Sequence, residues 1–165
     1  TKSRGKYLRN LVIFALVSEV PFDILLEEGI GFAGQNVFFT LAIALGVIWG
    51  ITKVKEKFTN EPTVSFFLQG TAIVAGCLLA YGLRTDYSYY GIVLAVIFYY
   101  YRNNRILACL VGYIWFTFEP WCFPAFIALL FYNGKRGISL KYFFYAFYPA
   151  HLLLLYVLRV LWIGN

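Results

Sequence analysis

The stretch that decides the fold is Tyr132-Asn133-Gly134-Lys135-Arg136-Gly137, followed by a long apolar run over residues 138–162. Two glycines bracket two cations, so backbone amides and positive charge can meet an anion together. The run that follows is too apolar for a soluble helix and exceeds the roughly 20 residues that cross a bilayer. The pattern therefore predicts a membrane-spanning helix that begins at a charged membrane surface.

The same run carries the single histidine of the chain, His151, ten residues beyond Lys141. At 1.5 Å per residue, His151 lies about 15 Å along the helix from that lysine, inside the hydrocarbon. Pro149 cannot donate to the carbonyl of Tyr145, which exposes a polar acceptor nearby. An ionisable residue at this depth is a candidate functional residue. The alternative is a structural histidine that bonds a carbonyl or a tyrosine across the bundle.

The composition indicates a membrane protein along the whole chain. Of the 165 residues, 61% are hydrophobic and only 13% are charged, whereas soluble domains carry about 25% charged residues. Apolar runs recur from end to end, which predicts a single integral membrane domain over residues 1–165. The net charge of +6 comes from basic residues in short loops. That pattern fits the positive-inside rule better than nucleic-acid binding.

The apolar runs predict an all-α fold, a polytopic transmembrane helix bundle with about seven membrane segments. The first segment, residues 7–20, is expected to stop near Pro21 and to be followed by an acidic interfacial loop or half-helix over residues 22–28. Several segments are shorter than a bilayer, so tilted or re-entrant helices are expected. The other six are expected at residues 36–52, 64–83, a span after Gly91 that ends at Tyr101, 106–118, 122–131 and 138–162.

The distribution of charge tests this arrangement. If residues 1–10 are cytoplasmic, alternating loops put 12 of the 14 Lys and Arg residues on the cytoplasmic side and six of the eight acids in or near the opposite side. We therefore expect a multi-pass protein with the N-terminal segment of this chain in the cytoplasm. The basic set is Lys2, Arg4, Lys6, Arg9, Lys53, Lys55, Lys57, Arg102, Arg105, Lys135, Arg136 and Lys141.

Two acids are further candidates for a functional site. Glu19 follows Ser18, and Asp86 precedes Tyr87 in a turn between two apolar runs. Either carboxylate can hold a cationic amine or orient a histidine. An ordinary loop cap is the alternative for Asp86. The three cysteines have no metal-type spacing, so no metal is expected.

Several motifs, in order along the chain, resemble the TraX family of membrane proteins. They are Tyr7-Leu8-Arg9-Asn10-Leu11, Phe14-Ala15-Leu16-Val17-Ser18-Glu19-Val20-Pro21-Phe22-Asp23, Asn36-Val37-Phe38-Phe39-Thr40-Leu41, Thr85-Asp86-Tyr87 with Tyr90-Gly91, Phe131-Tyr132-Asn133-Gly134-Lys135-Arg136-Gly137, and Lys141-Tyr142-Phe143-Phe144-Tyr145-Ala146-Phe147-Tyr148-Pro149-Ala150-His151-Leu152. The resemblance implies a polytopic acyltransferase-like protein, from a family named for acetylating the pilin subunit of conjugative pili. That family is similar to the acyltransferase-3 type of membrane enzyme.

One departure from the family pattern affects the site. Family members begin with about two further membrane helices, the first of which bears an Asp-His pair. This sequence lacks both helices and contains no methionine, so we expect it to be the C-terminal two-thirds of a larger domain. By resemblance, the absent histidine is the leading candidate for a catalytic base. The chain is therefore expected to hold part of an active site, with His151, Glu19 and Asp86 as its own catalytic candidates.

The resemblance also implies acetyl-CoA as the acyl donor. The phosphates of acetyl-CoA need cations, and its thioester needs a base and an oxyanion stabiliser. The alternative is that the basic residues only set the topology against anionic lipid. The candidate residues for the nucleotide end are Lys135, Arg136, Arg4, Lys6, Arg9 and Tyr132.

The expected function is thus a membrane-embedded acetyltransferase of the bacterial inner membrane. Its partners are expected to be acetyl-CoA, membrane lipid and a membrane-associated acceptor, which is a protein N-terminus, an amine or a sugar, without nucleic acid. A small transporter or channel-like protein, whose polar residues line a path, and a non-catalytic assembly protein remain alternatives. No GxxxxGK[ST], no GxGxxG after a strand and no GxSxG is present, so ATP hydrolysis, nicotinamide chemistry and serine hydrolysis have no support.

Overall fold

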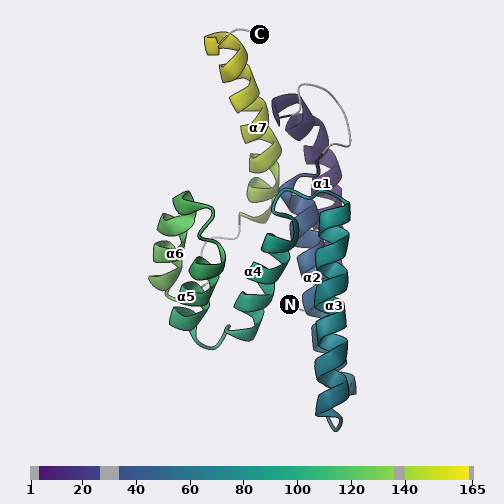
Figure 1. The fold of residues 1–165 in the computed structure, drawn as a ribbon. Coiled ribbons are helices and arrows are strands. Elements are labelled where there is room, and N and C mark those ends of the chain that lie inside the picture. The colour runs from purple at the N-terminus through teal and green to yellow at the C-terminus, as the bar shows by residue number, and fades with distance from the viewer. Residues whose placement is uncertain (1–3, 27–33, 136–139, 164–165) are drawn as a thin grey trace.

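The computed structural model describes residues 4–26, 34–135 and 140–163, and within these ranges it is built from helices (Figure 1). The predicted all-α class is confirmed, and the seven predicted segments correspond to seven α-helices in the described ranges. The helices are α1 (Arg4–Leu26), α2 (Val37–Lys57), α3 (Pro62–Gly82), α4 (Ser88–Tyr100), α5 (Arg105–Trp115), α6 (Phe123–Leu130), preceded by the 3₁₀ turn η1 (Pro120–Cys122), and α7 (Lys141–Ile163).

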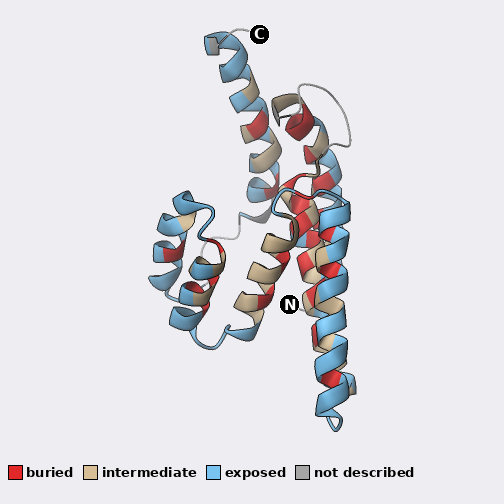
Figure 2. Ribbon diagram, viewed as in Figure 1, coloured by how far each residue is buried: buried red, intermediate tan, exposed pale blue. Residues whose placement is uncertain are grey.

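Three of the described helices are long and apolar enough to cross a membrane: α2, α3 and the Phe143–Trp162 part of α7. The remaining helices do not meet both requirements. The outward surfaces fit a lipid environment, because Phe66 and Phe67 of α3 are 73% and 67% exposed and Trp162 of α7 is 89% exposed. Figure 2 shows the buried residues on the inner faces of the helices and exposed residues on their outer faces. Such an excess of exposed apolar surface is unusual for a soluble monomer.

The predicted stop at Pro21 is wrong, because α1 continues through Pro21 to Leu26. Proline removes one helical hydrogen bond, but Phe22 and Asp23 beyond it are almost fully buried, with 6% and 1% exposed. In addition, Arg159 of α7 donates from Nη1 to the carbonyl of Leu25 at 2.9 Å, which satisfies an open carbonyl of the last turn. Residues 22–26 are therefore helical, as the half-helix alternative had it, but they continue α1 and form no interfacial loop. Residues 27–28 lie outside the described ranges.

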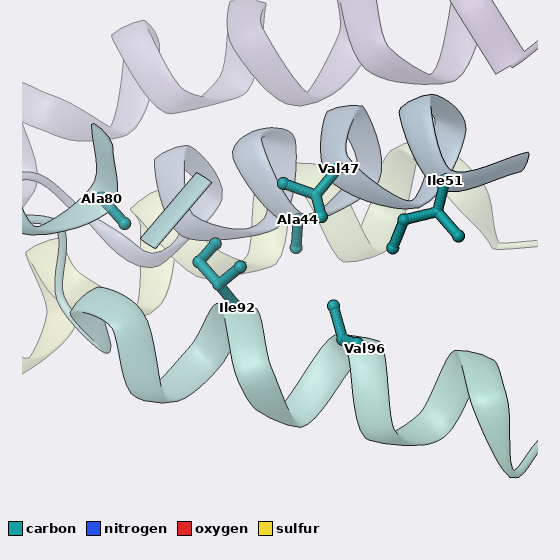
Figure 3. Close-up of a cluster of buried hydrophobic side chains, with 6 residues drawn as sticks. All are labelled: Ala44, Val47, Ile51, Ala80, Ile92 and Val96. Carbon is teal, nitrogen blue, oxygen red and sulfur yellow. The ribbon is translucent and has the colours of Figure 1, made fainter. Parts of the chain in front are cut away.

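The helices pack through three small apolar clusters. α2, α3 and α4 share a cluster in which Ala44 and Val47 of α2 face Ile92 and Val96 of α4 (Figure 3). A second cluster joins α1, α2 and α7, and a third joins α4 to the α5–α6 hairpin. Apolar side chains gain little from mutual burial in lipid, so close van der Waals packing is what holds such a bundle together.

Two turns fix the ends of α2 and α4 against each other. The backbone N–H of Gln35 donates to the carbonyl of Arg84 at 3.0 Å, and the N–H of Asp86 donates to the carbonyl of Gln35 at 2.7 Å. Together they form an isolated parallel bridge between Gln35 and Thr85. The turn before α2 and the turn before α4 are therefore held side by side. Polar side chains of both turns lie at the same end of the bundle.

Candidate functional site

Asn36 connects α1 to α2 at the centre of the candidate site. It is the N-cap of α2 and is completely buried. Its Oδ1 accepts from the N–H of Phe38 at 3.1 Å, as an N-cap does. Its Nδ2 donates to the carbonyl of Ala15 at 2.8 Å and to Oε2 of Glu19 at 2.5 Å. One amide thus caps a helix and orients a carboxylate.

Asn36 is not among the site residues that the sequence pattern predicts. A polar residue that begins an apolar run was the available signal, and it indicates an N-cap. The sequence pattern does not reveal that Nδ2 of the same amide donates to the carbonyl of Ala15 in α1, 21 residues earlier in the chain.

The Gln35–Thr85 bridge holds the backbone of Asp86 against Gln35, the residue before Asn36. The N-cap position of α4 is Tyr87, without a side-chain cap hydrogen bond, and the alternative role of Asp86 as an ordinary loop cap stays a prediction. Surrounding protein partly desolvates the carboxyl of Asp86 and raises its pKa, and the nearby carboxylate of Glu119 raises that pKa further. A bound proton or a nearby cation therefore stabilises the carboxyl group of Asp86 more than it stabilises that of an ordinary surface acid.

α7 contributes Tyr148 to the same place. Its hydroxyl faces the backbone N–H of Val37, and the carboxylates of Asp86 and Glu19 both lie within its electrostatic reach. Its ring packs edge-on against Phe38 with centroids 5.0 Å apart. We call the set Glu19, Asn36, Asp86 and Tyr148 the polar centre. It joins α1, the start of α2, the turn before α4 and α7.

Several buried hydroxyl groups surround the polar centre. Within the described ranges, Ser18 Oγ, Thr40 Oγ1 and the hydroxyl of Tyr145 have no hydrogen-bond partner, and their residues are 0%, 3% and 7% exposed. Leaving a buried polar group unsatisfied costs about 1–3 kcal/mol. Such groups are rare in native structures, and a ligand is one way to satisfy them.

The structure positions His151 on α7, three residues beyond Tyr148 and about 4.5 Å further along the helix axis. It is half-buried, and its ring stacks on Phe147 with centroids 5.5 Å apart. Glu19 and Asp86 thus both lie within electrostatic reach of Tyr148, and His151 lies one turn further along the same helix. Its predicted catalytic role stays a prediction.

The predicted nucleotide-binding residues lie on two elements. Lys6 and Arg9 are exposed in the first turns of α1, whereas Tyr132 and Lys135 belong to the loop after α6. The structure does not describe the side chain of Arg4, which begins α1. Arg136 and Gly137, the second of the two glycines that bracket the cations, lie outside the described residues.

Arg105 of α5 contacts the loop formed by residues 132–135, which we call the basic loop. Its guanidinium lies 5.6 Å from the ring centroid of Tyr132 and donates to the carbonyl of Tyr132. The hydroxyl of Tyr132 donates to the carbonyl of Lys135 at 3.1 Å, and the N–H of Lys135 donates to Oδ1 of Asn133 at 2.9 Å. Gly134, at φ +74°, permits the turn. The sequence analysis treated Arg105 only as a charge that sets topology.

The comparison with protein families decides the affiliation. The family model described as TraX protein matches residues 1–159. The chain belongs to the TraX family. The match includes every residue of the polar centre and the basic loop, so both belong to the TraX part of the chain. Comparisons with curated proteins and with solved structures find no significant match.

No group of three His, Cys, Asp or Glu side chains in the described part of this TraX protein is arranged to hold a metal ion. The chemistry available to the described residues is therefore that of carboxylates, hydroxyls, a histidine and cations. Carboxylates that are partly removed from water bind a cation or a proton strongly. Cations beside backbone turns bind phosphate.

Proposed function

We propose that this TraX protein is a membrane-embedded acyltransferase that moves an acetyl group from acetyl-CoA to an amine or hydroxyl of a membrane-associated acceptor. The observation that carries the proposal is the polar centre, in which an amide-held carboxylate, a second carboxylate and a phenol meet inside an otherwise apolar bundle. Membership of the TraX family, together with the acetylation that the resemblance implies, supports the reaction type.

The polar centre supports a role in handling the acceptor. Glu19, oriented by Asn36, and Asp86 would hold a protonated amine by charge-assisted hydrogen bonds. Transfer needs that amine to lose a proton before its nitrogen attacks the thioester carbonyl. The nitrogen–carbon bond then forms, the nitrogen loses a second proton, and the carbon–sulfur bond breaks. The thiolate of CoA takes up one of the two protons, and the other passes to water. Asp86, whose pKa is raised, and His151 of α7 are the proposed proton carriers in this chain.

The basic loop supports a role in holding the donor. Lys135 and Arg105 would attract the phosphates of acetyl-CoA, with Tyr132 packed beneath the guanidinium of Arg105. Lys6 and Arg9 are second candidates from α1. Under the positive-inside rule this loop would face the cytoplasm, where acetyl-CoA is available, and the protein would belong to the bacterial plasma membrane.

The test uses the full-length natural protein in lipid nanodiscs with isotope-labelled acetyl-CoA and a panel of amine and sugar acceptors. We expect acetyl transfer, and we expect the double variant Arg105→Ala, Lys135→Ala to weaken acetyl-CoA binding about tenfold, which is about 1.4 kcal/mol. The matched control is Lys53→Ala with Lys57→Ala, two cations of α2 outside the basic loop. Absence of both acetyl-CoA binding and transfer would exclude an acetyltransferase.

A transporter is the second candidate, and the buried hydroxyls favour it. Ser18 and Thr40 add unsatisfied polar atoms to the region of the polar centre, as the wall of a polar path would. Under this candidate, proteoliposomes should show flux of a cation or proton that depends on Glu19, without any requirement for acetyl-CoA. Flux without transfer would favour the transporter over the enzyme.

A further inference from the structure

An apolar groove of about 410 Å³ lies between α2, α4 and α5. Its volume falls in the range of about 300–1,000 Å³ that small-molecule sites occupy. On α2 its lining runs from Val37 to Ala44, and on α4 it runs from Tyr87 to Phe98. At 1.5 Å per residue these stretches extend about 10 Å and about 16 Å, so the groove follows the helix axes and is elongated.

The walls of the groove are suited to hydrocarbon. Leu41, Leu94 and Phe98 present apolar side chains, and Thr40 adds one buried hydroxyl that has no hydrogen-bond partner in the described ranges. Because α2 is long and apolar enough to span a membrane, an occupant would enter from lipid instead of water. A lipid-borne hydrocarbon chain is the occupant that such walls and such an access route favour.

Gly91 shapes the groove at one end. A Cβ at this position would lie 2.6 Å from Cγ2 of Thr40 and 3.0 Å from Cβ of Tyr87. The glycine thus lets α4 approach α2 next to the turn that carries Asp86. The close approach brings the groove and the polar centre together.

One end of the groove lies beside the turn that carries Asp86. Val37, which lines the groove, presents its N–H to Tyr148, and Tyr87, which also lines it, directly follows Asp86. Burial raises the pKa of Tyr87, and the carboxylates of Asp86 and Glu119 raise it further. An apolar groove that begins beside the turn carrying Asp86 is complementary to a hydrocarbon chain with a cationic head, and the carboxylate would disfavour an anionic head.

We propose that the groove holds the hydrocarbon chain of a single-chain membrane amphiphile whose protonated primary amine is held by Glu19 and Asp86. The inference rests on the proposed function for the fate of this ligand, which would be the acyl acceptor. Its amine nitrogen would bond to the acetyl carbon of acetyl-CoA as the carbon–sulfur bond breaks. The protonated amine loses two protons in forming the amide, so the products are an N-acetylated amphiphile, the free thiol of CoA, which receives one of these protons, and one proton released to water.

The probe for the experiment is a long-chain alkylamine with a photoreactive diazirine on its chain, compared with the alcohol of the same chain. The full-length protein in nanodiscs is irradiated with each probe, without acetyl-CoA, and labelled residues are mapped by mass spectrometry. We expect the amine probe to label Leu41, Leu94 or Phe98, with competition by the unlabelled alkylamine. The double variant Glu19→Gln, Asp86→Asn should lower labelling by the amine about tenfold and leave labelling by the alcohol unchanged.

Variants that fill the groove provide the second arm. Ala95 lines the groove, so Ala95→Leu and Ala95→Phe should reduce labelling in order of side-chain size. The matched control is Ala75→Phe, on the exposed face of α3 away from the groove. Labelling that is insensitive to both Ala95 variants, or equal labelling of the groove by the amine and the alcohol in the parent protein, would overturn the proposal.

The two proposals fail separately. Labelling needs no acetyl-CoA, so intact labelling without any acetyl transfer would remove the acyltransferase and keep the amine site. If the protein acetylates a soluble amine but the amine probe does not label the groove in the expected pattern, the acyltransferase proposal stands and the amphiphile is excluded as its acceptor.

Discussion

At the scale of single residues, the polar centre depends most on Asn36. Three hydrogen bonds use both ends of its amide, and they join the cap of α2 to the carbonyl of Ala15 and the carboxylate of Glu19. No other side chain type supplies an acceptor for the cap and two donors for α1 at this size. The position of Glu19 in the site is therefore a consequence of how α2 begins.

Asn36→Ala should destabilise the protein by about 1–3 kcal/mol, because it removes a cap and leaves buried acceptors of α1 without their donor. Thermal unfolding in detergent measures the change. Asn36→Asp keeps the cap acceptor but sets a second carboxylate beside Glu19, so this variant should regain stability as the pH falls. Asn60→Ala, in the exposed turn after α2, is the control and should have little effect. Equal stability of the Asn36 and Asn60 variants would contradict the role given to the amide.

Asp86 predicts a pH dependence with a definite sign. Burial, followed by the carboxylate of Glu119, raises its pKa above the ordinary value of 3.8. An acid with a raised pKa in the folded state stabilises the fold below pH 3.8, and this contribution is lost as the pH rises through the folded pKa. Asp86→Asn should thus be more stable than the parent at neutral pH.

The difference between Asp86→Asn and the parent should narrow as the pH falls toward 3.8. Melting temperatures across this pH range measure it. Glu119→Gln removes one of the two causes and should shrink the difference without abolishing it. A difference that stays constant with pH would mean that Asp86 acts through packing alone.

At the scale of elements, small residues decide how closely the helices approach. A Cβ at Gly76 of α3 would lie 2.2 Å from Cγ2 of Val47 of α2, so only glycine fits at the present separation. The sequence indicates such positions poorly. Gly70 and Gly76 lie on the same apolar run, yet a Cβ at Gly70 meets nothing within 4 Å. Which glycine permits a close contact depends on the neighbouring helix.

Gly76→Ala should destabilise the α2–α3 pair by about 1–3 kcal/mol through overpacking. Gly70→Ala, on the same helix, should be neutral or stabilising by up to about 1 kcal/mol, because alanine favours helix over glycine. The double variant Gly76→Ala, Val47→Ala should recover part of the loss by removing the methyl group that the new Cβ meets. Thermal unfolding of the four proteins tests this, and equal melting temperatures for Gly70→Ala and Gly76→Ala would contradict the close contact.

At the scale of the whole molecule, two ends differ in chemistry. Lys55 lies over the ring of Tyr100 with 4.3 Å to its centroid, which joins the end of α2 to the end of α4. Arg105, after the next turn, holds the basic loop. Cations of three loops therefore share one end, while the acids of the polar centre lie at the start of α2 and α4. In Figure 1, α7 rises at the top of the view, on the opposite side of the bundle from the turn that joins α2 to α3.

The helical class, the number of helices and their approximate bounds follow from apolar runs and turn residues, because these features are local. The course of α1 through Pro21 could not be predicted, since it depends on burial of Phe22 and Asp23 and on Arg159, which lies far along the chain. The features of the site divide in the same way into those that local sequence indicates and those that depend on distant segments. Glu19 and Asp86 are visible as isolated acids in apolar sequence, but the amide of Asn36 and the clasp of Arg105 on Tyr132 exist only once distant segments meet.

The separation of charge predicts the orientation of the protein in the membrane. Under the positive-inside rule the end that carries Lys55, Arg105 and the basic loop faces the cytoplasm. Single cysteines at Asn60 and Asn103, both exposed in turns of that end, should react with a membrane-impermeant maleimide only after cells are permeabilised. A cysteine at Thr117, exposed after α5, should react in intact cells. The background replaces Cys77, Cys109 and Cys122 with alanine.

Asn60 and Asn103 are separated by two helices, α3 and α4, so reaction of both from one side requires that the α3–α4 pair crosses the bilayer and returns. α4, with 13 residues, is short for this crossing, so the bilayer would have to thin or the helix to sit near one surface. Reaction of Asn60→Cys and Asn103→Cys from opposite sides would mean that α4 does not cross, and the polar centre would then lie on the same side as the basic loop. Such a result would place the basic loop and the carboxylates at the same membrane surface, and the acceptor would approach from the donor's side.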